Sequence, residues 1–390
     1  MKINKQRLIN MLDEVNNISS GGEGITRLAY TEYEEAALEW FIKKCEAYSI
    51  KTHRDSIGNA FGTVGPTKGD GILIGSHLDT VKNGGRYDGA LGVIAGLEVL
   101  ITLIENDIKL ERPVTVVSFR GEEANILGGT FGSRAFCELI DYNENFIRKL
   151  KNTPFNEKQV KDTAGYQYYK DYIELHIEQG KKLETNELNI GVVNAIAGIK
   201  RLDITVHGEA GHSGTIGMNE RNDALTHTAK ILLEFDRIVK DYGEPNIGTV
   251  GELYVEPNLP NVVPGKVNFI LEVRGTKIDT IREITEQIST FADNNYQVTI
   301  KPDVEKHPAS LSEKIINIAE EVCKESNINY QVMMSGANHD ANSLSNVMDS
   351  GLLFIPCLNG ISHNPKEFAE PSDMENGANI LLGTTLKLMS

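Results

Sequence analysis

Cysteine is scarce in this sequence. Its 390 residues include four cysteines, which lie far apart and form no CxxC pair: Cys45, Cys137, Cys323 and Cys357. This spacing argues against a disulfide framework and against a zinc site built from thiolates. Reduced thiols are typical of cytosolic proteins, so we expect a cytoplasmic protein.

Long apolar runs are also missing. The longest, Leu91–Ile104, is too short to cross a bilayer and contains Glu98. The opening segment, MKINKQRLINMLDEV, carries a charge every few positions and lacks the apolar centre and small-residue cleavage site of a secretory signal. We therefore expect a protein that is neither secreted nor embedded in a membrane.

Basic residues are in the minority. The sequence has 39 lysines and arginines against 55 aspartates and glutamates, which gives a formal charge of −16. A strongly acidic chain is repelled by nucleic acids and anionic membranes, so we expect neither as a partner. Acidity of this kind keeps a protein soluble and says little about its substrate.

The rest of the composition is that of a globular protein, with 40% hydrophobic and 24% charged residues. The length favours two domains. Apolar runs alternate with helical patterns towards both ends of the chain, which predicts an α/β fold with a mixed β-sheet sandwiched by helices. The expected strands are 71–76, 114–119, 172–177 and 352–356, and the expected helices are 3–18, 31–48, 91–105 and 128–139.

The middle of the chain has a different pattern. Strands that alternate apolar and polar residues are expected at 201–207, 249–255, 266–274 and 296–300, with helices at 222–242 and 279–293. This pattern predicts a compact α+β unit inserted into the first domain. We place the first domain at 1–196 and 306–390, and the inserted domain at 197–305.

Chemically useful side chains gather where the predicted strands end. The segment GSHLDTVKNGGRYDGALG places His77, Asp79 and Asp88 in a glycine-rich loop directly after a strand. Sites in open α/β sheets form beyond the carboxyl ends of strands, and imidazole and carboxylate are ligands of zinc, manganese and similar ions. Asp79 is near enough in sequence to fix the tautomer of His77. Ordinary polar loop residues are the alternative interpretation.

Three further clusters follow predicted strands in the same way. They are the pair Glu122–Glu123, His176 in the segment HIEQG, and His363 in the segment ISHN. Alone, each is more typical of a solvated turn or a structural histidine. Their shared position favours a metal site, in which one carboxylate binds the metal ion and its neighbour handles a proton.

Rival chemistries lack support in the sequence. It contains no GxSxG nucleophile elbow, no P-loop and no dinucleotide-binding glycine fingerprint after a strand. No cysteine stands in a recognisable nucleophile motif. Metal-dependent hydrolysis is therefore favoured.

Taken together, the motifs resemble those of the M20-type dinuclear metallohydrolases. The matching segments are SHLDTV, GGRYDGALGV, the Glu122–Glu123 pair, HIEQG, AGHSGT, NVVPG and the late HNP. Within the family, the chain resembles the hydantoinase/carbamoylase branch: N-carbamoyl-L-amino acid hydrolases, β-ureidopropionases and allantoate amidohydrolases. HIEQG separates this branch from the aminopeptidase-like and deacylase-like members. The resemblance runs nearly end to end and implies a zinc-exopeptidase-like catalytic domain with an inserted lid and dimerisation domain.

The resemblance also implies a set of metal ligands. Two divalent metal ions per subunit, zinc or manganese with cobalt or nickel as alternatives, would be bound by His77, Asp88, Glu123, His176 and His363. Asp88 would bridge the two ions. Glu122 would be the general base, and Asp79 would support His77.

In this family the inserted domain contributes substrate contacts. The matching residues are His212 in AGHSGT, Asn261 in PNVVPG and Arg274 in LEVRG, with Gln179 and His339 in matching segments near the metal ligands. A guanidinium binds a carboxylate in bidentate fashion, so lid closure is expected to bring Arg274 and Asn261 onto a substrate carboxylate. His212, from the same or the partner subunit, would donate to the oxyanion.

Two loops depart from the family pattern. After Glu123 the family usually continues with Gly, Ser or Thr, Arg and Phe, whereas this sequence has Ala124-Asn125-Ile126-Leu127-Gly128-Gly129. The loop 215–218 has Thr-Ile-Gly-Met in place of Thr-Thr-Pro-Met. The first loop borders the expected substrate pocket and puts the usual substrate in question, although neither change touches an expected metal ligand.

We therefore expect a homodimeric, metal-dependent amidohydrolase that cleaves a linear ureido or amide C–N bond in a small carboxylate substrate. An N-carbamoyl-L-amino acid is favoured, and it would yield the amino acid, carbon dioxide and ammonia. Allantoate is the first alternative, and a dipeptide or an acylated amino acid is the second. A non-enzymatic, metal-dependent binding protein is disfavoured because every catalytic position is filled.

Overall fold

The computed structural model describes residues 1–389 and divides into two compact units. The first unit combines Met1–Asn194 with the chain from Ser310 onward, and the second comprises Ala195–Ala309. The predicted domain limits at residues 196 and 306 lie within four residues of these boundaries.

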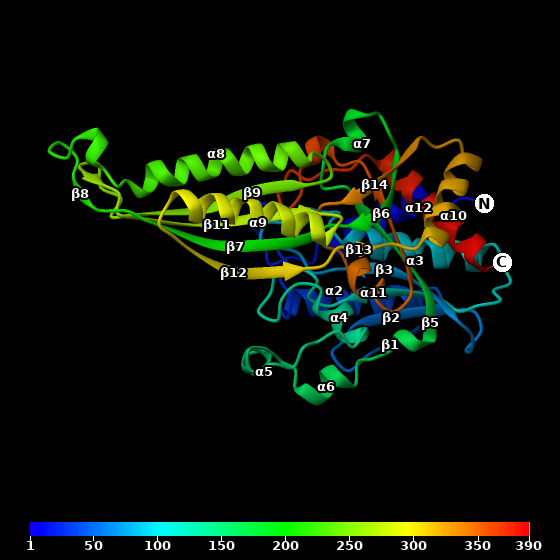
Figure 1. Ribbon diagram of the computed structural model, residues 1–390. Coiled ribbons are helices and arrows are strands. Elements are labelled where there is room, and N and C mark those ends of the chain that lie inside the picture. Colours follow the sequence, from blue (N-terminus) through cyan, green and yellow to red (C-terminus); the bar gives the residue numbers. More distant parts are fainter. Residues whose placement is uncertain (390) are drawn as a thin grey trace. The chain divides into compact units, whose positions relative to one another are not determined.

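A mixed sheet of nine strands forms the frame of the first unit (Figure 1). The strands are β1 (Lys51–Arg54), β2 (Ala60–Val64), β3 (Gly71–His77), β4 (Val114–Phe119), β5 (Tyr169–Ile177), β6 (Ile190–Ile196), β13 (Ala309–Ser310), β14 (Tyr330–Ser335) and β15 (Asp349–Ile355). Their order is β1-β2-β4-β3-β5-β15-β6-β13, with β14 paired to β6. The four neighbours β4, β3, β5 and β15 run parallel to one another, so their carboxyl ends lie at one edge.

The parallel strands were recognisable in the sequence because they are buried on both faces. Both β3 and β4 are buried along their whole length, and such strands have near-continuous apolar sequences. The predicted strand 114–119 has the bounds of β4. The predicted strand 71–76 is one residue shorter than β3, which ends at His77.

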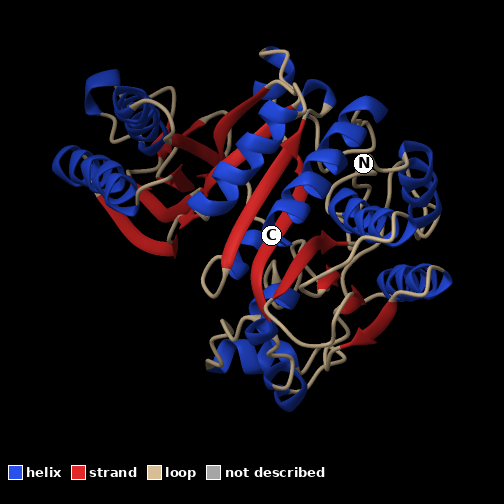
Figure 2. Cartoon of the chain, turned by 90° about the vertical axis from the view of Figure 1, so that its right-hand side faces the viewer, coloured by secondary structure: helices blue, strands red, loops and turns tan. Residues whose placement is uncertain are grey.

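Helices cover both faces of this sheet, as the predicted fold class requires (Figure 2). One apolar core joins the sheet to α1 (Lys5–Asn16), α2 (Glu32–Ala47), α3 (Ala90–Glu105), α10 (Glu313–Glu325) and α12 (Pro371–Met389). The shorter helices are α4 (Phe131–Phe136), α5 (Glu144–Leu150), α6 (Glu157–Lys161), α7 (Lys182–Thr185) and α11 (Asp340–Leu344). The sequence had not predicted α10 and α12, and it gave α4 too long a span, at 128–139.

A smaller apolar cluster lies beneath the segment that follows β4. We call it the satellite cluster, and it consists of Ile57, Leu127, Phe131, Ala135, Ile140, Phe146, Leu150, Phe155 and Val160. It packs the loop after the Glu122–Glu123 pair against α4, α5 and α6.

The second unit has the predicted α+β architecture. Its antiparallel sheet has the order β12-β7-β11-β9, formed by β7 (Gly198–His207), β9 (Ile247–Glu256), β11 (Lys266–Gly275) and β12 (Val298–Lys306). The helices α8 (Ala224–Tyr242) and α9 (Ile278–Asn295) share an apolar core with the buried alternate residues of β11. A short ribbon pairs β8 (Gly211–His212) with β10 (Val262–Val263). The strand expected at 296–300 extends to Lys306, and its added residues are mostly polar and exposed.

Among residues 1–389, no helix combines the length and the apolar character that crossing a membrane requires.

The core of the second unit gives a test of the fold. We expect Phe269→Ala to destabilise this unit by about 3–5 kcal/mol, because the ring is completely buried and its removal leaves a cavity. Urea unfolding followed by circular dichroism measures the change. Leu233→Ala, in the same unit but at a side chain that is 72% exposed, should change the free energy of unfolding by less than about 0.5 kcal/mol. Equal effects of the two substitutions would contradict this packing.

Candidate metal centre

The parallel strands bring distant residues to one edge of the sheet. In the register of β3 and β4, His77 lies beside Phe119, the last residue of β4. In the register of β15 and β5, Phe354 lies beside His176. The residues that end or follow β3, β4, β5 and β15 therefore gather at one place, which is the arrangement that the sequence predicted.

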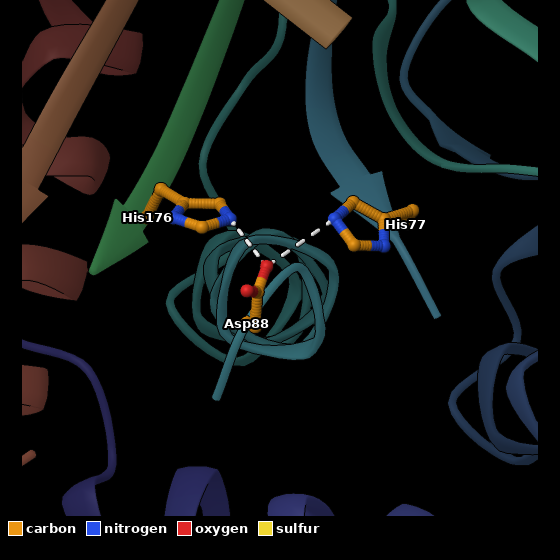
Figure 3. Close-up of side chains that lie close together, drawn as sticks. All are labelled: His77, Asp88 and His176. Carbon is orange, nitrogen blue, oxygen red and sulfur yellow. Dashed lines mark ion pairs between the residues drawn. The ribbon is translucent and has the colours of Figure 1, made fainter. Parts of the chain in front are cut away.

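The first group of candidate metal-binding side chains consists of His77, Asp88 and His176. One ligand atom from each lies within 4.8 Å of the other two. The two imidazoles reach Asp88 from β3 and β5, while Asp88 lies just before α3 (Figure 3). The Oδ1 atom of Asp88 is 3.1 Å from Nε2 of His176 and 3.6 Å from Nε2 of His77.

The second group consists of Asp88, Glu123 and His363. Here the other oxygen of Asp88, Oδ2, lies 3.2 Å from Nε2 of His363. The same Nε2 atom is 3.4 Å from Oε1 of Glu123. That oxygen is buried and has no hydrogen-bond partner among the described residues. A buried, unpaired carboxylate oxygen beside an imidazole fits a metal ligand, since such groups otherwise carry a desolvation penalty.

Backbone carbonyl groups orient the imidazoles of β3 and β5 through their Nδ1 atoms. The Nδ1 atom of His77 lies 2.9 Å from the backbone oxygen of Asp79, and that of His176 lies 2.9 Å from the backbone oxygen of Ile177. When Nδ1 donates to a carbonyl, Nε2 keeps its lone pair and can bind a metal ion. The structure thus brings together all five residues that the resemblance implied as ligands.

Asp79 supports this arrangement differently from the expectation. Its carboxylate is 3.6 Å from Nδ1 of His77, too far for a hydrogen bond, so it is the Asp79 carbonyl that orients the ring. The carboxylate instead accepts hydrogen bonds from the backbone N–H groups of Glu122, at 3.1 Å, and Glu123, at 3.0 Å. Asp79 therefore fixes the loops after β3 and β4 together.

The surroundings of the centre shift the pKa values of its carboxylates in opposite directions. Burial raises the pKa of Asp88, but hydrogen bonds with His176 and His363 outweigh this effect and hold the pKa well below its usual value. Burial raises the pKa of Glu122 well above its usual value, and it raises the pKa of Glu123 to about 7. A buried carboxyl group of raised pKa beside a metal-binding cluster is suited to exchanging protons near neutral pH.

The carboxylates of the centre raise the pKa values of two of its histidines. Burial lowers the pKa of His77, but Glu122, Asp79 and Asp88 together outweigh it and raise the pKa well above the usual value. The hydrogen bond with Asp88 raises the pKa of His363 to about 9. The protein groups alone therefore form a site that favours bound positive charge.

Residues that the sequence interpretation missed also hold the centre. Glu367 is 2% exposed and accepts hydrogen bonds from the backbone N–H groups of Tyr87, at 2.8 Å, and Asp88, at 3.1 Å. It also pairs with the hydroxyl of Ser362, the residue before His363, at 2.9 Å. In the sequence, Glu367 is an acidic residue four positions after His363. No local pattern distinguishes it from an acidic residue on the surface.

Two side chains of the HIEQG segment have different structural roles: Glu178 caps a helix, and Gln179 contacts Asp88. Glu178 accepts hydrogen bonds from the backbone N–H groups of Lys182, at 2.8 Å, and Leu183, at 2.9 Å, and so caps the start of α7. Gln179 donates through Nε2 to Oδ2 of Asp88 at 2.8 Å. Its Oε1 atom is buried and has no hydrogen-bond partner within residues 1–389.

His339 lies behind the centre. Its ring is 2% exposed and contacts the ring of His176 edge to face, with 4.5 Å between the centroids. Its Nε2 atom is 3.0 Å from the hydroxyl of Ser335. Burial and the nearby His176 lower the pKa of His339 well below its usual value. The geometry gives it a supporting contact, and its role in substrate binding stays a prediction.

The predicted substrate residues of the second unit do not form one group. His212 and Asn261 are exposed neighbours, since β8 pairs with β10 and Ser213 donates its backbone N–H to the Asn261 carbonyl at 3.1 Å. Arg274 lies at the far end of β11, eight positions from Lys266, which corresponds to about 27 Å along a strand. Within one chain, β11 thus lies between Asn261 and Arg274 and holds them apart. Their joint contact with a substrate carboxylate stays a prediction.

Arg274 is held by another residue that the sequence interpretation missed. Glu272, two positions earlier on the same face of β11, accepts from Nε of Arg274 at 2.6 Å and from Nε of Arg201 at 2.5 Å. The guanidinium is thereby oriented on the polar face of the sheet.

Comparison with known proteins agrees with this geometry. Residues 73–387 match the family described as peptidase family M20/M25/M40. The chain belongs to this family. It is similar to an N-carbamoyl-L-amino-acid amidohydrolase of a Pseudomonas species, with 34% identity, covering 99% of this chain and 98% of the relative. It is also similar to the allantoate amidohydrolase of Escherichia coli, with 32% identity, covering 92% and 91% of the two chains.

A solved structure shows the same architecture. The hydantoinase/carbamoylase family amidase of Burkholderia multivorans matches with a TM-score of 0.91 and 28% identity, over 99% of this M20 chain and 98% of that one. Together with the curated relatives, this similarity supports a hydrolase that acts on carbon–nitrogen bonds.

Gly89 provides a test of the metal centre. A Cβ atom at this position would lie 2.4 Å from the ring of His77. We expect Gly89→Ala to displace the imidazole and to weaken binding of zinc or manganese roughly 10- to 100-fold, as measured by isothermal titration calorimetry.

Gly243 is the matched control for this substitution. It has the same φ of 66°, but a Cβ atom there would meet nothing within 4 Å. Gly243→Ala imposes similar backbone strain and should leave the metal affinity unchanged. Equal affinities in the two variants would show that His77 does not bind the metal ion.

Proposed function

We propose that this chain is a dinuclear metal-dependent amidohydrolase that cleaves the ureido C–N bond of a small carboxylate substrate, with an N-carbamoyl-L-amino acid favoured. One observation carries the proposal. The two oxygens of Asp88 face different groups of ligands, His77 and His176 on one side and His363 with Glu123 on the other. A carboxylate in this position is suited to bridging two cations.

The donor set decides which ions suit the site. His77, Asp88 and His176 would hold one ion, and Asp88, Glu123 and His363 would hold the other. Imidazole nitrogen with carboxylate oxygen suits zinc or manganese, with cobalt or nickel as alternatives. When bound, the ions would polarise the scissile carbonyl and make water a stronger acid.

Glu122 is the residue we propose as general base. Its Oε2 atom lies 3.6 Å from Nε2 of His77, so its carboxylate borders the first ligand group without belonging to either group. Burial raises its pKa well above the usual value, which makes it a better proton acceptor than an exposed glutamate. It would take a proton from the attacking water and pass it to the leaving nitrogen.

Two further contacts would position the substrate. The buried and unpartnered Oε1 atom of Gln179 is suited to accepting a hydrogen bond from a ureido N–H group. Arg274 would bind the substrate carboxylate with a guanidinium that Glu272 already orients.

We further propose a homodimer through the second unit, in which His212 of the partner subunit donates to the oxyanion and Asn261 accompanies it. The separation of these residues from Arg274 within one chain supports this arrangement. The strand β9 lies at the edge of its sheet and exposes Ile247, Leu253 and Tyr254, which offers an apolar surface for a second copy. Four free, buried cysteines support a cytoplasmic location.

The substrate class is tested by ammonia release from the metal-reconstituted protein. The panel contains N-carbamoyl-L-amino acids, β-ureidopropionate and allantoate, the substrate named for the Escherichia coli relative. We expect release that chelation abolishes and that zinc or manganese restores. The best substrate identifies the subfamily. Release from none of them would contradict the proposal, and dipeptides and acylated amino acids would then be tested.

Two substitutions separate turnover from binding. We expect Glu122→Gln to lower kcat by about 10²–10⁴-fold with little change in KM, because the amide cannot accept the proton. Arg274→Ala should raise KM roughly 10- to 100-fold, as expected for a lost charge-assisted hydrogen bond, with a smaller effect on kcat.

Surface variants serve as controls for these measurements. Glu111→Gln and Arg237→Ala alter exposed charges and should leave both constants unchanged. Near-normal turnover in the Glu122→Gln variant would defeat the assignment of the base.

A further inference from the structure

The backbone that carries the Glu122–Glu123 pair is bonded at every polar group. The N–H of Gly121 donates to Glu34 at 3.1 Å, and those of Glu122 and Glu123 donate to Asp79. The carbonyl of Glu122 accepts from the N–H of Thr130 at 2.7 Å. The carbonyls on either side of it, at Gly121 and Glu123, both accept from one side chain, that of Asn125.

Asn125 uses its whole hydrogen-bonding capacity at this place. Its Nδ2 atom lies 2.8 Å from the Gly121 oxygen and 2.8 Å from the Glu123 oxygen. Its Oδ1 atom accepts from the N–H of Leu127 at 2.8 Å and from the hydroxyl of Tyr30 at 3.1 Å. A primary amide has two donor hydrogens and two acceptor positions, and here all four are matched.

Tyr30 anchors Asn125 to a rigid part of the fold. The ring of Tyr30 packs edge to face on Phe131 and Phe155 of the satellite cluster, with centroids 5.9 and 5.2 Å apart. Its backbone N–H donates to Glu34 at 2.7 Å, and Glu34 also binds the Gly121 N–H and the side chain of Arg120. The hydroxyl that reaches Asn125 is therefore fixed from outside the loop.

We propose that Asn125, anchored by Tyr30, is the positioning residue that sets the orientation of Glu122 and Glu123. The inference rests on the proposed roles of these two glutamates as base and ligand. The carbonyls of Gly121 and Glu123 bracket the peptide units from which both side chains project. Without the Asn125 amide, the Glu123 carbonyl loses this donor, and the Gly121 carbonyl keeps only the N–H of Phe131, at 3.0 Å. The two peptide planes are then less restrained. Misplacing a reacting group by about 1 Å can lower a rate about 100-fold.

The position of Asn125 in the sequence gives the inference its interest. It lies in the loop Ala124–Gly129, where we expect this sequence to differ from the usual family pattern. The clamp is therefore expected to be particular to this loop. The hydrogen bonds of Asn125 restrain both this loop and the backbone from which the proposed base projects.

Three variants test the clamp. Asn125→Ala removes all four hydrogen bonds, and Tyr30→Phe removes only the anchor. Asn125→Asp keeps the size and the acceptor atoms but removes the donors. Asn156→Ala is the control, because Asn156 caps α6 beside the same satellite cluster, and its capping hydrogen bonds are with Gln159, outside the loop. It should lower the Tm without altering kcat or KM.

We expect Asn125→Ala and Asn125→Asp to lower kcat by roughly 10- to 100-fold with little change in KM, and Tyr30→Phe to lower kcat by a few fold. Amide hydrogen exchange at Gly121–Glu123 should speed up about tenfold in Asn125→Ala and remain as in the wild type in Asn156→Ala. Unchanged kcat in both Asn125 variants of an enzyme that hydrolyses the ureido panel would overturn the clamp.

The exchange measurement separates this inference from the proposed function. If the wild-type protein hydrolyses no ureido substrate, the proposed activity fails, but exchange still decides whether Asn125 holds the loop. Faster exchange at Gly121–Glu123 in Asn125→Ala supports the clamp, and exchange equal to that of the wild type overturns it.

Discussion

The carboxylate of Asp88 is the point on which the rest of the site depends. His77 and His176 approach one of its oxygens, while His363, Gln179 and Ser362 approach the other. These residues come from segments separated by as many as 286 positions, from His77 to His363. The sheet brings them to one place because β3, β5 and β15 are parallel neighbours. The centre thus depends on this strand order.

Much of the acidic charge near the centre binds backbone. Asp79, Glu34 and Glu367 each accept two or more backbone N–H groups from the loops that carry the functional side chains. Hydrogen bonds to a charged group are stronger than neutral ones, and they restrain peptide planes without occupying the site. The buried negative charge that results also explains why the protein groups favour a cation. The same carboxylates therefore give rigidity and electrostatic attraction.

The sequence predicted what depends on local pattern. Apolar runs located β3 and β4, and the polar residues at strand ends indicated Asp88 and the four side chains around it. It could not predict partners that meet only in the folded chain. Nothing near Glu34 in the sequence indicates that it binds Gly121, and nothing near Asn125 indicates that it binds the carbonyls on either side of Glu122. For Asn261 and Arg274, the motifs indicated which residues take part in binding, but they could not show the 10-residue strand that lies between them in one chain.

That separation has a consequence for the chemistry. A substrate small enough to be an N-carbamoyl amino acid cannot span about 27 Å of β11, the product of eight positions and the rise of a strand. If His212 and Arg274 both contact the substrate, they must come from two chains, and a single chain then has an incomplete site. Glu272 would make such a division workable, because its ion pair with Arg274 lies within one chain. Each chain would thus contribute a preorganised half, and catalysis would depend on the association of the two.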